Sequence, residues 1–416
     1  MPVFQRITTF TSGKLVPTVV HEERFKGSVR EVAEVRGKAF LPYALPPKLD
    51  WDRIVGSSRR ELIAAERALA RLNGRASKLP NPHLLLGPFA RREARLSSLI
   101  EDTVATPKEI ALAESGVLFG RDDPKEIANY IFALNHGLDS PLPLCNRLFK
   151  EMHEILLRGV RGGRDLPGHF RREQNYIGKK SLGFLQARFV PPPHGEILER
   201  CMADLEQFVN GPHEQIPELV SIALGHYQFE CIHPFRDGNG RLGRLIMTLS
   251  LCKYGLLSKP YIYVSEFFSK HEEKYKDLLL RVSTEGAWEA WIRFVLEAFA
   301  VQARAADIRA DAILCLQSEY THKLTGPHSS SLLIRLCDHL FSRPVITIDD
   351  AEKVLGVTKT AARRHVTTLV KKGILDKSEE YGKAHVFVAN GIIAAAETEL
   401  SSEPQDSRTE STPNAS

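Results

Sequence analysis

The stretch His233–Arg244 reads His-Pro-Phe-Arg-Asp-Gly-Asn-Gly-Arg-Leu-Gly-Arg and decides how the rest of the chain is interpreted. Its Gly238–Gly240 turn carries little side chain, so an anion can approach the backbone amides. An apolar helix follows at once, and the unpaired N–H groups and positive dipole end of a helix attract phosphate. Arg241 and Arg244 are three residues apart and project from the first turn on neighbouring faces. Together these features predict a polyphosphate site.

Two other side chains of this stretch can do chemistry on a bound phosphate. Asp237 precedes the turn, and a carboxylate beside phosphates is the usual protein ligand of Mg²⁺. His233 has an ordinary pKa near ~6.5, so it can accept a proton near neutral pH. Each signal alone is weak, because a single histidine, a Gly-Asn-Gly turn or an arginine pair is usually structural. Their combination predicts attack of a hydroxyl on a nucleotide phosphate.

The overall composition is that of an ordinary globular protein. The chain has 416 residues, of which 43% are apolar and 26% charged, and its length predicts two to three domains. The net charge of +5 is too weak to indicate a partner, so that argument depends on local charge. The six cysteines form no Cys-x-x-Cys pair and are typical of reduced thiols. With no secretory leader and no apolar stretch of ~20 residues, we expect a cytoplasmic protein without a membrane span.

Hydrophobic periodicity predicts a mainly α-helical fold. Residues 1–50 are expected to be irregular and stiffened by prolines, and helices are expected near 59–72 and 91–100. Residues 170–193 mix aromatics, glycine and prolines, which favours a hairpin or flap. The expected organisation is an N-terminal helical region (1–110), a catalytic domain (111–300), a helical connector (301–340), a winged helix-turn-helix (341–395) and a disordered tail (396–416).

The sequence resembles the Fic family, whose motif is His-x-Phe-x-[Asp/Glu]-Gly-Asn-Gly-Arg-x-x-Arg. All fixed positions are met, by His233, Phe235, Asp237, Gly238, Asn239, Gly240, Arg241 and Arg244. Residues 166–178 are similar to the lead-in to the family's flap, and residues 189–193 to its end. The resemblance covers about residues 40–300, and residues 340–390 are similar to a winged helix that often accompanies the family.

The resemblance implies a Fic-type helical bundle with a β-hairpin flap, and transfer of AMP from ATP to a Ser, Thr or Tyr hydroxyl. The acceptor would be a target protein or the chain itself, and homodimers are common among similar proteins. By resemblance, His233 would be the general base, Asp237 would hold Mg²⁺, Gly238, Asn239 and Gly240 would bind the α- and β-phosphates, and Arg241 and Arg244 the outer phosphates. Removal of AMP, which some relatives perform, stays open.

Ser97–Asp102 resembles the family's inhibitory motif, [Ser/Thr]-x-x-x-Glu-[Gly/Asn], with Asp102 in place of the usual last residue. The resemblance implies that Ser97 and Glu101 belong to an inhibitory helix, in which Glu101 pairs with Arg244. That carboxylate would compete with the γ-phosphate of ATP for one guanidinium. The alternative is an ordinary helix C-terminus with exposed acids. After the motif, His271 and Tyr275-Lys276 replace the Asn and Tyr-Tyr that the family often carries.

Within residues 341–395, helices are expected at 348–355 and 358–372, followed by a two-stranded wing. The second helix carries five basic residues and no acid. Such a helix can neutralise phosphates and enter a major groove, which predicts DNA contact through Lys359, Arg363 and Arg364. The alternative use of this domain is contact with a dimer partner or a target protein. Two functions therefore compete: an autoinhibited protein adenylyltransferase, and a DNA-binding regulator whose Fic domain senses a nucleotide. The intact His233 and Asp237 favour the enzyme.

Overall fold

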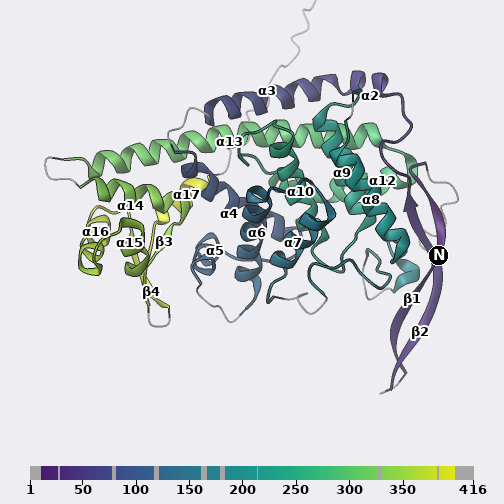
Figure 1. Ribbon diagram of the computed structural model, residues 1–416, viewed down its shortest axis with the longest axis horizontal. Coiled ribbons are helices and arrows are strands. Elements are labelled where there is room, and N and C mark those ends of the chain that lie inside the picture. Colours follow the sequence, from purple (N-terminus) through teal and green to yellow (C-terminus); the bar gives the residue numbers. More distant parts are fainter. Residues whose placement is uncertain are drawn as a thin grey trace, which may run out of the picture.

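The computed structural model describes residues 11–26, 29–76, 81–116, 121–160, 166–178, 183–212, 214–326, 330–381 and 384–398. Helices form most of this part of the chain. A two-stranded β arm lies at one end of the molecule and a small three-stranded sheet near the other (Figure 1). The mainly helical prediction is therefore confirmed.

Helix α9 (Glu218–Ile232) lies at the centre of the larger helical part of the molecule and is buried on nearly all sides, as expected for a helix that is apolar all round. Helix α10 (Asn239–Lys253) follows it and packs against it. Other helices surround this pair: α6 (Asp123–Asp139), α7 (Asn146–Leu156), α8 (Glu196–Asn210), α11 (Ser265–Lys270) and α12 (Glu272–Glu285). The loop between α9 and α10 carries the Fic-like motif.

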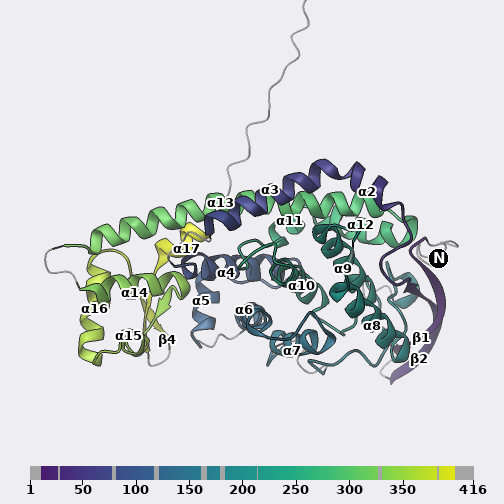
Figure 2. The same ribbon diagram turned by 45° about the horizontal axis from the view of Figure 1, so that its top comes forward.

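A single long helix, α13 (Trp288–Leu324), runs along most of the molecule, and α3 (Arg59–Ala76) lies beside it (Figure 2). The helix predicted near 59–72 is confirmed, and its apolar residues Leu62, Ala65, Leu69 and Leu72 are all buried. The short helix α2 (Trp51–Ser57) contacts α3, whereas the short helix α5 (Pro107–Glu114) packs against α6. No helix within the described ranges is long and apolar enough to cross a membrane.

The prediction that residues 1–50 are irregular is wrong for most of that segment. Strands β1 (Gly13–Lys26) and β2 (Val29–Pro42) pair antiparallel, with Gly13 opposite Pro42 and Lys26 opposite Val29. The N-terminal region is consequently not purely helical. The arm is anchored where Phe40 is fully buried and its N–H donates to the carbonyl of Val190, 2.8 Å away. The strands form because β-branched residues recur along both segments.

The expected flap is a loop held by one antiparallel bridge, between Ile177 and Phe189. A short 3₁₀ turn, η2 (Phe184–Gln186), lies inside it, and residues 179–182 lie outside the described ranges. The flap exit at Val190 meets the β arm through the hydrogen bond from Phe40. The flap and the arm therefore support one another beside α9.

The last folded part of the chain, residues 331–398, is referred to below as the C-terminal module. Its helices and strands are α14 (Ser331–Ser342), β3 (Val345–Ile346), α15 (Ile348–Leu355), α16 (Lys359–Lys371), β4 (Asp376–Tyr381), β5 (Ala384–Val388) and α17 (Asn390–Ala396). The strand order is β3-β5-β4. Both predicted helices and the predicted strand pair are present. From residue 399 onward, the predicted disordered tail lies outside the described residues.

Candidate active site

The motif loop is shaped by its own side chains. His233 ends α9 in the left-handed conformation, with φ +49°, and Gly238 at φ +75° precedes α10. Asn239, which is almost fully buried, accepts a hydrogen bond from the N–H of Phe235 and donates one to its carbonyl, both at 2.9 Å. Asn239 therefore closes the turn with its side chain, which leaves the backbone of the turn to face a ligand.

His153 of α7 also holds this loop, and the sequence analysis missed it. Its ring stacks on Phe235 with centroids 3.8 Å apart. Its Nδ1 accepts from the N–H of Gly168, so its Nε2 carries the proton and donates to the carbonyl of Asp237, each at 2.9 Å. Burial lowers the pKa of His153 to about 4, so the ring is neutral. The only sequence signal was a histidine on the otherwise apolar face of α7.

Arg171 holds the backbone around His233 in place. It is 6% exposed, and its Nε donates to the carbonyl of His233 at 3.0 Å while its N–H donates to the carbonyl of Pro234 at 2.9 Å. Its Nη2 donates to the carbonyl of Pro192 at the flap exit. Arg171 was noted in the sequence only as part of the flap lead-in. It joins the flap to the backbone that carries His233.

His233 is poised to accept a proton. Burial, together with the nearby Arg171 charge, lowers its pKa to about 4, although the carboxylates of Glu101 and Asp237 oppose this shift. At neutral pH the imidazole is therefore uncharged. It lines a cavity of about 390 Å³, a size that suits a nucleotide-sized ligand.

Arg244 projects into the same cavity and is fully engaged with the predicted inhibitory segment. Its Nε donates to Ser97 Oγ and its Nη2 to the carbonyl of Ser97, both at 2.8 Å. Nη2 also contacts Glu101 Oε1 at 3.0 Å. Burial alone would raise the pKa of Glu101, but the Arg244 charge outweighs it and lowers that pKa. The structure thus brings Ser97, Glu101 and Arg244 together, as predicted.

The Glu101 carboxylate also lies directly over the Gly-Asn-Gly turn. A Cβ atom on Gly240 would overlap with Oε1 of Glu101, so any larger residue at this position would require the carboxylate to move. Asp102, which follows, adopts φ +59°. That left-handed conformation favours Gly or Asn and is tolerated by Asp, which explains the residue types at this place in the motif.

Arg241 is placed differently from Arg244. Its side chain is 2% exposed and pairs with Glu126 of α6, and its Nη2 lies 3.6 Å from Asp237 Oδ1. The positive charge of Arg241 is therefore already balanced by the carboxylates of Glu126 and Asp237. Binding of an outer phosphate by Arg241 stays a prediction.

Asp237 has the properties that a magnesium ligand needs. Half of its side chain is exposed at the mouth of the turn, and Oδ1 accepts from the N–H of Gly238 at 2.7 Å. Within the described residues, no three His, Cys, Asp or Glu side chains group into a dedicated metal cage. A single carboxylate suits Mg²⁺, which keeps water and phosphate oxygens as its other ligands.

The far wall of the cavity includes Tyr275 and Lys276, whereas His271 bonds back to the carbonyl of Phe267. Glu230 lines the cavity as well, and burial together with the nearby Glu101 charge raises its pKa to about 8, although Arg244 opposes the shift. The predicted nucleic-acid contacts, Lys359, Arg363 and Arg364, lie on α16 in the C-terminal module and not at this site.

Comparisons with known proteins agree with this geometry. Residues 59–139 match the Fic/DOC family N-terminal model, and residues 143–251 match the Fic/DOC family model. The protein adenylyltransferase Fic of Aedes aegypti is 34% identical over 131 residues, and that of Drosophila melanogaster is 33% identical over 131 residues. Each match covers 31% of this chain and 23% of the relative, so the chain spans less than a quarter of those proteins.

Among solved structures, a Fic family protein from Desulfovibrio desulfuricans G20 superposes with a TM-score of 0.52 at 20% identity. The superposition covers 84% of this chain and 97% of that chain, which supports the fold. The matched segments, residues 59–139 and 143–251, are similar to the N-terminal domain and the Fic domain of the Fic/DOC family.

Proposed function

We propose that the chain is a protein adenylyltransferase that uses ATP and Mg²⁺ to modify a Ser, Thr or Tyr hydroxyl of a protein target or of itself. The observation that carries this proposal is one cavity bordered by a neutral His233, the Gly-Asn-Gly turn at Gly240 and the guanidinium of Arg244. The relatives named protein adenylyltransferase support it.

In the proposed reaction, His233 takes the proton of the acceptor hydroxyl. The hydroxyl oxygen then bonds to the α-phosphorus of ATP, the bond to the β-phosphate bridge breaks, and pyrophosphate leaves. The Gly238–Gly240 backbone and Arg244 would orient the phosphates, and Asp237 would hold Mg²⁺, which supplies charge neutralisation. Arg171 and His153 contribute by fixing the backbone of the base and of the turn.

Autoinhibition is part of the proposal. The Glu101 carboxylate lies against Arg244 and over Gly240, so ATP phosphates and Glu101 compete for one anion site. Removing this carboxylate frees both the guanidinium and the turn. The Ser97 contacts to Arg244 do not depend on it.

The test is incubation of wild type, Glu101→Gly and the double variant Glu101→Gly/His233→Ala with labelled ATP and Mg²⁺. Glu101→Gly is expected to raise self-modification by about tenfold or more, because loss of one competing charge-assisted contact is worth about 1.5–3 kcal/mol. The double variant should bind ATP but incorporate no label. Equal incorporation by wild type and Glu101→Gly would refute the inhibitory role, and labelling without His233 would refute the base. Loss of label from modified protein on adding wild type would instead indicate removal of AMP.

A second function is favoured by the exposed basic face of α16, where Arg363 and Arg364 are both exposed. Lys359 pairs with Asp349, so it contributes less free charge. If the C-terminal module is a DNA-binding winged helix, Arg363→Glu/Arg364→Glu should weaken DNA retardation in a gel and lower its salt dependence. Lys377→Glu of β4 is the control. If Arg363→Glu/Arg364→Glu leaves the affinity for DNA unchanged, this result would favour a protein partner for this face.

A further inference from the structure

We propose that the C-terminal module latches the inhibitory helix α4 (His83–Leu99) in its inhibitory position, with Glu397 as the latch. This inference rests on the proposed function and names its regulation. The inhibitory contact at Arg244 would then depend on how the C-terminal module is seated, although that module lies outside the cavity.

The first turns of α4 are packed against the C-terminal module. A Cβ atom on Gly87 would lie 2.8 Å from the carbonyl oxygen of Ser342 and 2.9 Å from that of Phe341, so the two backbones are in close contact. Arg91 donates to the carbonyl of Ser342 and pairs with Glu114 of α5. This end of the helix is therefore fixed to the end of α14.

Glu397, directly after α17, forms ion pairs with the middle of α4. Its Oε2 pairs with Nη1 of Arg92 at 2.8 Å and with Nη2 of Arg95. The exposed fraction of the side chain is 9% for Arg92, 26% for Arg95 and 21% for Glu397, so solvent screens these contacts only in part. One carboxylate from the C-terminal module thus joins two successive basic positions of the inhibitory helix.

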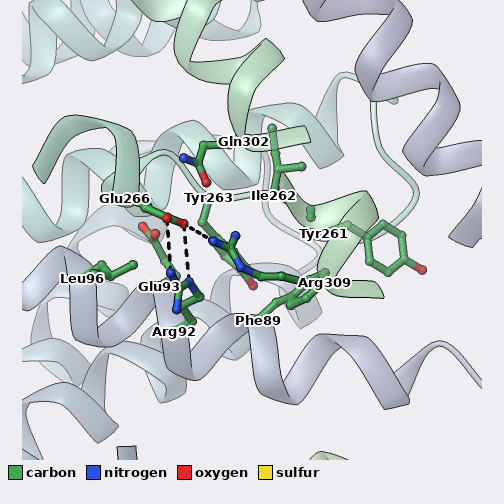
Figure 3. Close-up of a pocket in the computed structure, with 11 residues that line it drawn as sticks. Phe89, Arg92, Glu93, Leu96, Tyr261, Ile262, Tyr263, Glu266, Gln302 and Arg309 are labelled. Atoms are coloured by element: carbon green, nitrogen blue, oxygen red, sulfur yellow. Dashed lines mark hydrogen bonds and ion pairs between the residues drawn. The ribbon is translucent and has the colours of Figure 1, made fainter. Parts of the chain in front are cut away.

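The same cluster extends into the catalytic domain (Figure 3). Glu266 of α11 lies between Arg92 and Arg309, at 3.2 Å and 2.7 Å. Burial would raise the pKa of Glu266, but the two guanidiniums outweigh it and lower that pKa to about 2. Arg309 of α13 also donates to the carbonyl of Thr398, 3.2 Å away. Helix α4, α13 and the end of the C-terminal module therefore share one buried ionic cluster.

The spacing along α4 connects this cluster to the active site. Arg95 is two residues before Ser97, which is about 3 Å along a helix axis. Ser97 holds Arg244 through two hydrogen bonds, and Glu101 follows one turn later. Release of Glu397 would loosen the turn that presents Ser97 and Glu101, because it removes the carboxylate that pairs with Arg95 and one of the two that pair with Arg92.

The alternative is that Glu397 only anchors the C-terminal module and has no influence on Glu101. The two possibilities differ in a double-mutant cycle, since a latch acts only through the inhibitory carboxylate. Glu397→Gln keeps the shape of the side chain and removes its charge. Glu319→Gln is the matched control, because Glu319 is a half-exposed acid that pairs with Lys323 on α13.

The experiment measures AMP incorporation and ATP affinity for wild type, Glu397→Gln, Glu319→Gln, Glu101→Gly and Glu101→Gly/Glu397→Gln. We expect Glu397→Gln to raise AMP incorporation by about fivefold or more, which is the lower end of the usual coupling between two sites. The same variant should bind ATP more tightly. It should add nothing in the Glu101→Gly background. Wild-type behaviour of Glu397→Gln, or an equal effect in both backgrounds, would overturn the latch.

Hydrogen–deuterium exchange separates failure of the latch from failure of the proposed function. Amides of residues 93–101 should exchange faster in Glu397→Gln than in wild type or Glu319→Gln, with unchanged exchange in α10. If Glu101→Gly incorporates no AMP, the proposed activity is wrong, and the ATP affinities and exchange rates still decide whether Glu397 controls α4. Unchanged exchange in residues 93–101 would overturn the latch.

Discussion

Arg244 is the residue on which the proposed inhibition depends. One guanidinium binds the Ser97 hydroxyl, the Ser97 carbonyl and the Glu101 carboxylate. The first two contacts fix the direction of the guanidinium, whereas the third is the one that a phosphate would replace in the proposed reaction. Lysine could not replace it, because a single ammonium lacks the planar fork that makes these contacts simultaneously.

Asp102 offers a test of backbone strain next to this contact. It holds φ +59°, which costs a residue with a Cβ about 1 kcal/mol or more, whereas glycine adopts it freely. Asp102→Gly is therefore expected to raise the thermal unfolding temperature and to retain inhibition, since Glu101 keeps its carboxylate. Asp102→Val should lower the unfolding temperature and raise AMP incorporation. Equal unfolding temperatures for the Gly and Val variants would contradict the strain argument.

At the scale of elements, the sequence predicted best where a local pattern determines the structure. The α9–loop–α10 unit was identified because its glycines, its arginine pair and the apolar helix lie within one short stretch. The helices at 348–355 and 358–372 were placed within a residue of α15 and α16, because Thr347 and Thr358 cap them and Gly356 ends the first.

The elements that the sequence did not reveal depend on contacts between distant segments. The β arm was missed because its prolines and charges hide the strand pattern, and its burial depends on the flap through Phe40 and Phe189. His153 was missed because its partners, Gly168 and Asp237, are 15 and 84 positions away. The pairing of Glu397 with Arg92 bridges 305 positions, and no periodicity can indicate that contact.

At the scale of the whole molecule, α4 and α13 join the helices around the motif loop to the C-terminal module. Helix α13 passes from the catalytic domain to the C-terminal module without a break, and α4 contacts both (Figure 1). The expected connector at 301–340 is thus mostly the continuation of α13, followed by α14. The buried ionic cluster lies where these parts meet.

Buried neutral histidines should make the stability of the whole fold depend on pH. Burial lowers the pKa of His153 to about 4 and that of His226 to about 3, against about 6.5 in the unfolded chain. Between these values the unfolded chain binds more protons than the folded one, so the free energy of unfolding falls as pH falls below about 6.5. By about pH 5, His153 alone should account for a loss of about 2 kcal/mol.

His153→Gln isolates this contribution, because glutamine can still accept from Gly168 and donate to the carbonyl of Asp237 but does not titrate. The measurement is urea unfolding at about pH 7.5 and about pH 5. We expect the free energy of unfolding of wild type to fall between these pH values, and the fall to be smaller by about 2 kcal/mol in His153→Gln. His322→Gln, at the exposed end of α13, should behave as wild type. If wild type and His153→Gln lose the same stability on acidification, His153 does not stay neutral in the folded protein, and the hydrogen-bond pattern assigned to the motif loop is wrong.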